Sequence, residues 1–496
     1  MARDFLPYDL DQHYLLPQDM REWLPEGHLA WFVSDVADDL DLSEIVGAYE
    51  KQELRGRPGY DPTMMVKLLL YAYCVGKPSS RKIEKATYEE VPFRVLSADQ
   101  HPDHASIAAF RRRHLAALSG LFLQVLMLCR KAGLVKLGHV ALDGTKVRAN
   151  ASRHKAMSYE RMGAAEEQLS AEVAELLAEA ERADVREDGL YGKEKRGDEL
   201  PKELKRRKTR IARIRAAKEA LEREARERAE LAAEAARERL REREAKEAAR
   251  GKRFGGRPPR VPDPETAKPG PREQKNFTDP ESRIMMDGAT KSYVQAYNAQ
   301  AAVDSGSQVI VAASVTQEAN DKRQLRPLLK QIAVNLGELP KKASADCGYY
   351  SADNLTDPDL EAVELYVPPE KRVLSCALAD AMRAKLASEE GRAVYAQRKA
   401  VAEPVFGQIK EVRGLRRFSL RGLKLVDEEW QLVCAMHYAD LRIMPTAGCP
   451  SLAGGGGLAD EVGIITGFRG RRGACRGRGS ARGRCPAGWS GRALFP

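Results

Sequence analysis

Apolar residues recur every three or four positions in two N-terminal stretches, residues 62–75 and 107–132. This is the period of a helix that buries one face. Residues 81–96 have the composition of a further short helix, and Asp103 is placed to cap a helix that follows a proline-containing turn. Residues 1–135 are therefore expected to form an all-helical N-terminal domain.

The helix that follows Asp103 ends in three consecutive arginines, Arg111, Arg112 and Arg113. A helix-turn-helix arrangement would let Arg111 and Arg112 contact DNA. A solvated basic helix end, which the helix dipole favours, explains the same residues equally well. Both interpretations stay open here, and the helical domain is a candidate DNA-binding domain.

Alternating apolar and polar residues predict strands in the rest of the chain, beginning with residues 138–149. Residues 294–304 and 307–316 have the same character and are separated by Ser-Gly, which predicts a hairpin. A helix over residues 320–336, two short strands and several late helices follow. This order predicts an α/β fold in which helices flank a mixed sheet.

A long charged segment, residues 159–250, interrupts this order after the first strand, which residues 136–158 contain. Its heptad-like apolar spacing predicts a helical hairpin with a weak coiled-coil seam. The predicted seam positions are Leu204, Ile211, Ile214, Leu221, Ala225 and Ala232. The basic stretch 202–215 either lies along DNA or is a solvated face. Residues 251–280 are dense in glycine and proline and predict a linker, after which residues 281–445 would complete the sheet.

The formal net charge of +10 favours a polyanionic partner. Residues 201–250 carry a net +7 and residues 446–496 a net +6, so the rest of the chain sums to −3. The basic character is thus concentrated in two segments outside the predicted sheet. It does not by itself mark the sheet as a nucleic-acid surface.

The eight cysteines are widely scattered and form no CxxC pair, so neither a zinc site nor a disulfide framework is expected. His101, Asp103 and His104 form a cluster that could bind a metal, although Pro102 favours a surface turn. No stretch approaches 18 consecutive apolar residues, and the N-terminus lacks the pattern of a signal peptide. We therefore expect a cytoplasmic protein without a membrane partner.

Three acidic residues stand where this layout would let them converge. Asp143 lies in the first strand, Asp346 at the end of a later strand, and Glu403 in a late helical region. Each has a simpler explanation. Asp143-Gly144 is a common hairpin turn, Asp346 could make an Asx turn, and Glu403 could be a solvated helix glutamate.

The sequence around these residues is more specific. The segments VALDGTKVRANAS, YVQAYNAQAAVD, VTQEANDKRQL, SADCGYYS and YAQRKAVAEPVFGQIKEVRGLRRFSLRGL resemble those of bacterial insertion-sequence transposases of the DDE class. The chain is most similar to the eleven-eighty-two group, which is related to insertion-sequence family four. The resemblance covers residues 1–158 and 276–445 and is most specific around EPVFGQIK.

This resemblance implies a ribonuclease-H-like catalytic core with an acidic triad at Asp143, Asp346 and Glu403. Carboxylate oxygens suit Mg²⁺ or Mn²⁺, and two such ions about 3.5 to 4 Å apart can assist in-line displacement at a phosphodiester. The implied reaction is hydrolysis of a strand at the element end, followed by attack of the freed 3′-hydroxyl on target DNA. The implied partners are double-stranded DNA and a second copy of the chain, in a synaptic homodimer at the bacterial nucleoid.

The family pattern of tyrosine, arginine, glutamate and lysine falls on Tyr395, Arg398, Glu403 and Lys410. One more residue separates Arg398 from Glu403 than in the family. At 100° per residue, Arg398 would point about 140° away from Glu403 and Lys399 about 40° away. This spacing favours Lys399 on the face of Glu403 and puts the role of Arg398 in question.

Pro404 favours a helix that begins or kinks at Glu403, where free backbone N–H groups could bind phosphate. Tyr395, Arg398, Lys399, Lys410 and Arg413 are candidate DNA contacts in this region. A basic solvated stretch explains Lys410 and Arg413 too.

The resemblance stops near residue 445, where a tail rich in glycine and arginine begins. Residues 446–496 cannot build a packed core, and they either bind nucleic acid nonspecifically or result from a frameshift. The leading function is metal-dependent DNA strand cleavage and strand transfer at the terminal inverted repeats of an insertion sequence. Two alternatives stay open, namely an inactive transposase-derived DNA-binding protein and a ribonuclease-H-like nuclease without strand transfer.

Overall fold

The computed structural model describes residues 19–50, 59–191, 202–288, 290–370 and 376–440. All of them belong to the unit Met1–Ala447, and the predicted tail lies outside the described residues. No helix in these ranges combines the length and the apolar character needed to cross a membrane.

The N-terminal part folds as helices, as its apolar periodicity predicts. The elements are η1 (Met20–Trp23), α1 (Leu29–Asp39), α2 (Ser43–Glu50), α3 (Pro62–Cys74), α4 (Ser80–Glu89), α5 (Val91–Leu96), α6 (His104–Arg113) and α7 (Leu115–Lys131). The carboxylate of Asp61 caps α3 by accepting a hydrogen bond from Met64 N at 2.8 Å, and Pro62 occupies the first turn. Because α1, α2 and α5 pack around α3, nearly all of its side chains are buried.

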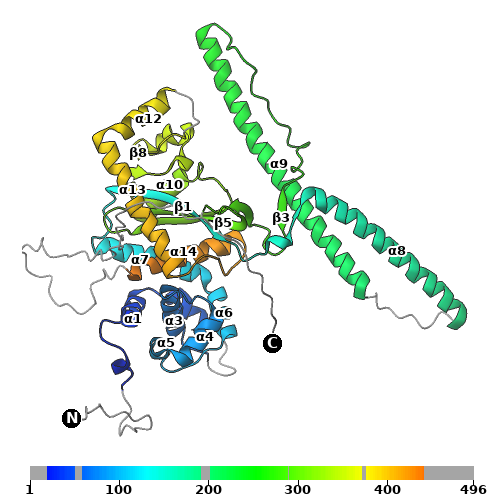
Figure 1. Cartoon of the computed structure of the whole chain (residues 1–496), viewed down its shortest axis with the longest axis horizontal. Coiled ribbons are helices and arrows are strands. Elements are labelled where there is room, and N and C mark those ends of the chain that lie inside the picture. Colours follow the sequence, from blue (N-terminus) through cyan, green and yellow to red (C-terminus); the bar gives the residue numbers. More distant parts are fainter. Residues whose placement is uncertain (1–18, 51–58, 192–201, 289, 371–375, 441–496) are drawn as a thin grey trace, which may run out of the picture. The chain divides into compact units, whose positions relative to one another are not determined.

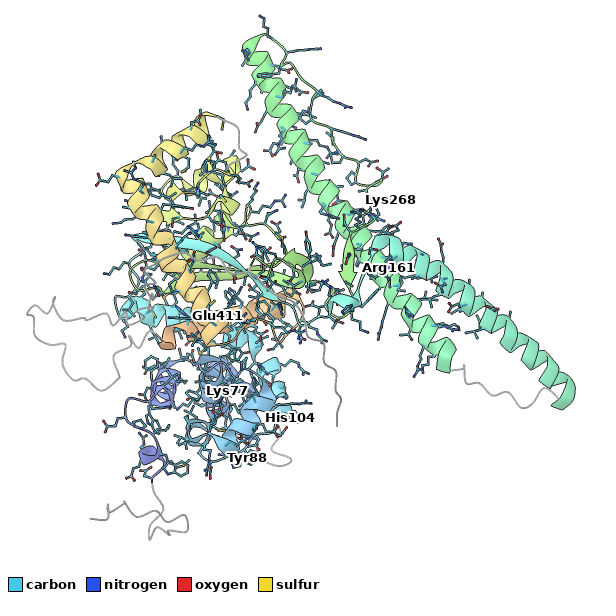
Figure 2. The ribbon with its side chains drawn as sticks, in the orientation of Figure 1. Lys77, Tyr88, His104, Arg161, Lys268 and Glu411 are labelled. Atoms are coloured by element: carbon cyan, nitrogen blue, oxygen red, sulfur yellow. The ribbon has the colours of Figure 1, made fainter. Side chains whose placement is uncertain are left out.

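Asp103 caps α6, as predicted, by accepting hydrogen bonds from two backbone amides of the first turn at 2.9 Å. The ring of His101 stacks on Tyr88 with centroids 3.9 Å apart, and His104 Nδ1 lies 2.8 Å from Glu84 Oε2. Figure 2 labels Tyr88 and His104 on the N-terminal helices. The histidine cluster is therefore engaged in separate protein contacts.

The sheet consists of strands β1 (His139–Arg148), β4 (Arg283–Met286), β5 (Tyr293–Asp304), β6 (Ile310–Thr316), β7 (Lys342–Ser344) and β8 (Glu364–Tyr366). Its order is β4-β5-β1-β7-β8, and β6 also pairs with β5. Strand β5 runs antiparallel to β1, β4 and β6, whereas β7 and β8 continue the sheet in parallel with β1. The predicted β5–β6 hairpin is confirmed. Asp143 pairs with Ala301 inside the ladder, so the turn interpretation of Asp143-Gly144 is wrong.

Helices cover this mixed sheet, as the α/β prediction requires (Figure 1). The remaining elements are α10 (Leu325–Leu336), η3 (Cys347–Tyr349), α11 (Ala352–Leu355), η4 (Pro358–Leu360), α12 (Ala377–Ala387), α13 (Glu389–Gly407), the π-helical η5 (Gln408–Val412) and α14 (Leu423–Asp440). Helix α10 packs on β5 and β6, α13 packs on β1, and α14 packs against β6, α7 and α3. One apolar core therefore includes both the N-terminal helices and the sheet.

The charged segment forms two long helices that pack against each other, α8 (Tyr159–Tyr191) and α9 (Lys202–Arg250). Four predicted seam residues are buried, namely Ile211, Ile214, Leu221 and Ala225. Met162 and Leu169 of α8 complete this second apolar cluster. Ala232 is exposed, and the side chain of Leu204 lies outside the described ones.

The linker prediction for residues 251–280 is wrong at its end. Residues Gln274–Asn276 form β3, which pairs antiparallel with β2 (Ala156–Ser158). Lys275 Nζ also lies 2.6 Å from Glu224 Oε1 of α9. These partners are far away in the sequence, so local composition does not reveal the strand.

Candidate functional site

Two adjacent parallel strands place Asp143 and Asp346 next to each other. The register pairs Ala141 of β1 with Ser344, the last residue of β7, and Asp346 follows two residues beyond this strand end. Asp143 lies two residues further along β1, close enough for the charge of Asp346 to raise its pKa. Asp346 Oδ1 accepts a hydrogen bond from Gly348 N at 2.8 Å and thereby caps η3. The predicted Asx turn is therefore present, and it fixes the carboxylate at the strand end.

Asp143 faces a buried arginine of α13. Its Oδ2 lies 3.5 Å from Arg398 Nη1, and the two side chains are 20% and 8% exposed. Burial raises the pKa of Asp143 to about 6, although the positive charge of Arg398 opposes this rise. The negative charges of Asp346 and Asp321 raise the pKa further. At neutral pH the carboxylate of Asp143 is thus ionised, and this ionisation lowers the stability of the folded state.

Asp321 adds a third carboxylate, which the sequence analysis did not single out. Its Oδ1 accepts hydrogen bonds from Asn298 Nδ2 at 2.6 Å and Gln300 Nε2 at 2.7 Å. Lys146 Nζ lies 3.6 Å from the same oxygen. Asn298 and Gln300 are fully buried on β5, and two amide side chains on a buried strand were the signal available in the sequence.

The glycine after Asp143 makes this arrangement possible. A Cβ atom at Gly144 would lie 2.3 Å from Gln300 Nε2 and 3.0 Å from Asp321 Oδ1. Such a distance is too short for non-bonded atoms, so only glycine lets Gln300 reach Asp321 across β1. The hydroxyl of buried Tyr349 donates a hydrogen bond to Gln300 Oε1, and burial raises the pKa of Tyr349 well above its ordinary value.

Lys146 provides a second buried cation beside these acids. Burial lowers its pKa, whereas the carboxylates of Asp321, Asp346 and Asp143 raise it. The carboxylates therefore sit between two cations, Arg398 on α13 and Lys146 on β1.

Glu403 does not join this cluster. It is exposed on α13, whereas Arg398 on the same helix is 7% exposed and faces Asp143. The angle of about 140° between the two positions explains this difference, because a helix that turns Arg398 toward β1 turns Glu403 away from it. Arg398, and not the exposed Lys399, is the residue that reaches the carboxylates.

Helix α13 continues through Pro404, so the predicted helix start at Glu403 is wrong. Proline removes the N–H group that would bond to the carbonyl four residues earlier. That carbonyl, Ala400 O, instead accepts a hydrogen bond from Gln308 Nε2 at 3.2 Å. Glu403 lies inside the helix, where backbone amides are engaged and do not bind anions.

Two of the predicted DNA contacts are buried in the protein. Arg111 is 7% exposed and donates hydrogen bonds to Pro78 O and Ser80 Oγ, both at 2.6 Å, and to Tyr73 OH at 3.2 Å. Arg413 is 3% exposed. Neither guanidinium is presented to a ligand in solution, which differs from the expectation for both residues.

The other predicted contacts are more accessible. Arg112 and Lys399 are exposed. Lys410 Nζ donates a hydrogen bond to Lys146 O at 3.0 Å, and burial lowers its pKa. Half-buried Tyr395 lies beside Arg398, whose guanidinium carbon is 5.7 Å from the ring centre.

The described residues contain no group of three acidic, histidine or cysteine side chains that could hold a metal ion. Asp143, Asp321 and Asp346 interact electrostatically, but Asp143 faces Arg398 and Asp321 faces Lys146. The arrangement as it stands therefore does not fit a metal ion.

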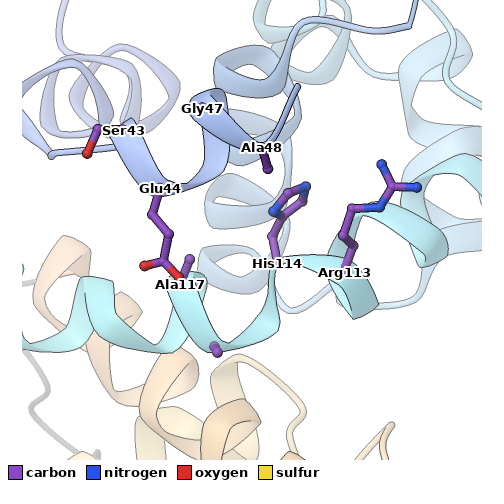
Figure 3. A pocket seen from close by; sticks show the side chains of 8 residues that line it. Ser43, Glu44, Gly47, Ala48, Arg113, His114 and Ala117 are labelled. Atoms are coloured by element: carbon purple, nitrogen blue, oxygen red, sulfur yellow. The ribbon is translucent and has the colours of Figure 1, made fainter. Parts of the chain in front are cut away.

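The N-terminal helices contain a hollow of about 520 Å³, and its lining residues are different from those of the carboxylate cluster. Figure 3 shows Glu44, Arg113 and His114 around it. His114 Nε2 lies 3.0 Å from Tyr49 OH, and burial lowers the pKa of His114. None of the sheet carboxylates lines this hollow, so it is not the candidate catalytic site.

Comparison with protein families gives matches for two separate segments of the chain. The family described as Transposase domain (DUF772) matches residues 18–113, and the family described as Transposase DDE domain matches residues 370–438. These two matches support an insertion-sequence DDE transposase. No curated protein and no solved structure matched this transposase. The two matched segments include Arg398 and Glu403 but not Asp143, Asp321 or Asp346.

Proposed function

We propose that this transposase cuts DNA strands at the terminal inverted repeats of its insertion sequence and joins the freed ends to target DNA. The observation that carries the proposal is the closeness of Asp143 on β1 to Asp346 just after β7, in a chain with matches to two transposase domains. Acidic side chains that converge from neighbouring segments of a sheet are suited to chemistry at a phosphodiester.

The proposal includes a ribonuclease-H-like core of the eleven-eighty-two group. Its support is the mixed sheet, in which an antiparallel hairpin adjoins β1 on one side and two parallel strands adjoin it on the other. The charged segment of α8 and α9 enters the chain between β1 and the strands that complete the sheet, which supports its assignment as an insertion.

Asp143 and Asp346 are proposed as catalytic acids on their geometry, and Glu403 on the family resemblance. The proposed requirement for a pair of Mg²⁺ or Mn²⁺ ions rests on the family resemblance alone, since the carboxylates as arranged here do not fit a metal ion. Within the chain, Arg398 and Lys146 hold the carboxylates in place, and Asp321 positions Lys146.

Exposed Arg112 and Lys399, together with half-buried Tyr395 and Lys410, are proposed to contact the phosphate backbone of double-stranded DNA, whereas buried Arg398 is not. Because two element ends have to be brought together, a synaptic homodimer is also proposed. Sedimentation of the purified protein with and without DNA ends would measure it, and a monomer under both conditions would contradict it.

Incubation of the purified protein with DNA carrying the element ends, with and without Mg²⁺, tests the proposal. Strand nicking followed by joining supports a transposase, nicking alone indicates a nuclease, and binding alone indicates an inactive DNA-binding protein. Asp143→Asn, Asp346→Asn and Glu403→Gln should each abolish cleavage. Intact cleavage in all three variants would show that the acids are assigned wrongly. Short inverted repeats flanking the reading frame would identify the substrate.

A further inference from the structure

The charges of α9 are segregated along its length. Residues 205–218 contain eight basic and no acidic side chains, whereas residues 219–250 contain nine basic and ten acidic ones. The second part has the mixture of signs that a solvated helix usually has. The first part does not. Seven of its eight cations divide into two groups by the direction they face, and exposed Lys208 belongs to neither group.

The inward-facing cations are neutralised by α8. Arg215 Nε and Lys218 Nζ lie 2.7 Å and 3.2 Å from the carboxylate oxygens of Glu166. Arg207 Nε lies 3.2 Å from Glu172 Oε2. These ion pairs flank the apolar seam of Ile211 and Ile214. They join α9 to α8, and this structural role explains part of the basic stretch.

The outward-facing cations have no such role. Lys205, Arg206, Arg210 and Arg213 are exposed, and none of them forms an ion pair with a described residue. At 100° and 1.5 Å per residue, the four side chains lie within an arc of about 140° and along about 12 Å of the helix. Together with Thr209 they line a shallow hollow of about 570 Å³.

This segregation costs helix stability, because like charges three or four residues apart repel each other by about 0.2 to 0.5 kcal/mol per pair. Arg210 has such neighbours on both sides, at Arg206 and Arg213. An anion with closely spaced charges would relieve the repulsion, and duplex DNA carries one negative charge per roughly 1.7 Å of its axis. The hollow offers no aromatic side chain on which an unpaired base could stack, which disfavours single strands.

We propose that Lys205, Arg206, Arg210 and Arg213 form a binding face for the phosphate backbone of duplex DNA, independent of sequence. The inference rests on the proposed action of this transposase on DNA and assigns the partner of its charged hairpin. The face lies outside the two matched transposase domains and is distinct from the acids of the sheet.

A variant of the full chain in which these four residues are replaced by glutamine tests the proposal, since glutamine keeps the helix propensity and removes the charge. Exposed Arg226, Arg237, Arg239 and Arg241 lie on the same helix, and replacing them by glutamine gives a control with the same change in net charge. Circular dichroism would verify that both variants keep their helices. The probe is a short duplex of unrelated sequence, with binding followed by fluorescence anisotropy at increasing salt.

Four lost phosphate contacts should lower the slope of log affinity against log salt by about 3.6. Between about 50 and 200 mM salt, wild type should therefore lose about 150-fold more affinity than the variant, and the control should match wild type. Equal slopes for variant and control would overturn the proposal, and so would a loss confined to single-stranded DNA. If wild type shows the expected salt dependence of binding to duplex DNA but does not cleave element ends, only the proposed catalysis is refuted.

Discussion

Replacing Asp143 by asparagine is expected to stabilise the folded transposase at neutral and alkaline pH. Burial raises the pKa of Asp143 from an ordinary value of 3.8 to about 6, against the attraction of Arg398. The folded state therefore binds the carboxyl proton of Asp143 more tightly than the unfolded state does. Stability falls as the pH rises through this interval, and the loss amounts to about 3 kcal/mol once the carboxylate is fully ionised.

Asparagine has the shape of the protonated aspartic acid but cannot ionise. The variant should match wild type near about pH 4 and exceed its free energy of unfolding by about 3 kcal/mol near about pH 8. The side chain is 20% exposed, so solvent screening removes little of this difference. The same substitution should abolish cleavage, which would separate a loss of activity from a loss of folding.

Urea unfolding in a buffer with a metal chelator, followed by tryptophan fluorescence, would measure the difference at several pH values. Trp430 is fully buried, and its Nε1 donates a hydrogen bond to Gln300 O at 2.9 Å, so it reports on the sheet. Asp103→Asn is the control with the opposite sign, because hydrogen bonds from Ser106 lower the pKa of the exposed Asp103. A difference between Asp143→Asn and wild type that stays constant across the pH range would refute the reasoning.

Three further predictions concern the core that joins the helical layer to the sheet. Arg111→Gln should lower the free energy of unfolding by about 1 to 3 kcal/mol in urea titrations, because it removes the buried guanidinium that donates hydrogen bonds to Pro78 O, Ser80 Oγ and Tyr73 OH; an unchanged free energy would contradict this. Gly76→Ala should lower the melting temperature, since Gly76 has φ +71° and an added Cβ would lie 2.6 Å from Arg413 O. Burial lowers the pKa of His437 to about 3, so wild type should lose stability as the pH falls below about 6.5, and His437→Gln should remove this dependence in acid titrations.

Local patterns predicted much of the fold correctly. The helix over residues 62–75, the cap at Asp103, the strand through Asp143 and the β5–β6 hairpin are confirmed. Each depends on residues that are close in sequence, such as an alternating strand or a capping carboxylate. The pairing of β3 with β2 could not be predicted in this way, because more than a hundred residues separate the two strands.

The candidate site was predictable only in part for the same reason. Asp143 and Asp346 followed from the strand order, but the rotation of α13 that selects Arg398 is fixed by packing against β1. Asp321 was missed because its position depends on Asn298 and Gln300, which the register of β5 places next to β1. A loop aspartate shows no periodicity of its own, so its role emerges only from these cross-strand contacts.

The distribution of charge has a consequence for how this transposase would hold DNA. Asp143, Asp321 and Asp346 repel phosphate, and the cations beside them, Arg398 and Lys146, are largely buried and already face carboxylates. Affinity for DNA therefore has to come from exposed cations elsewhere, since each of these gains a phosphate without first losing an acidic partner. Binding and cleavage should then separate: neutralising the outward face of α9 would weaken salt-dependent binding, while Asp143→Asn would remove cleavage and leave binding intact.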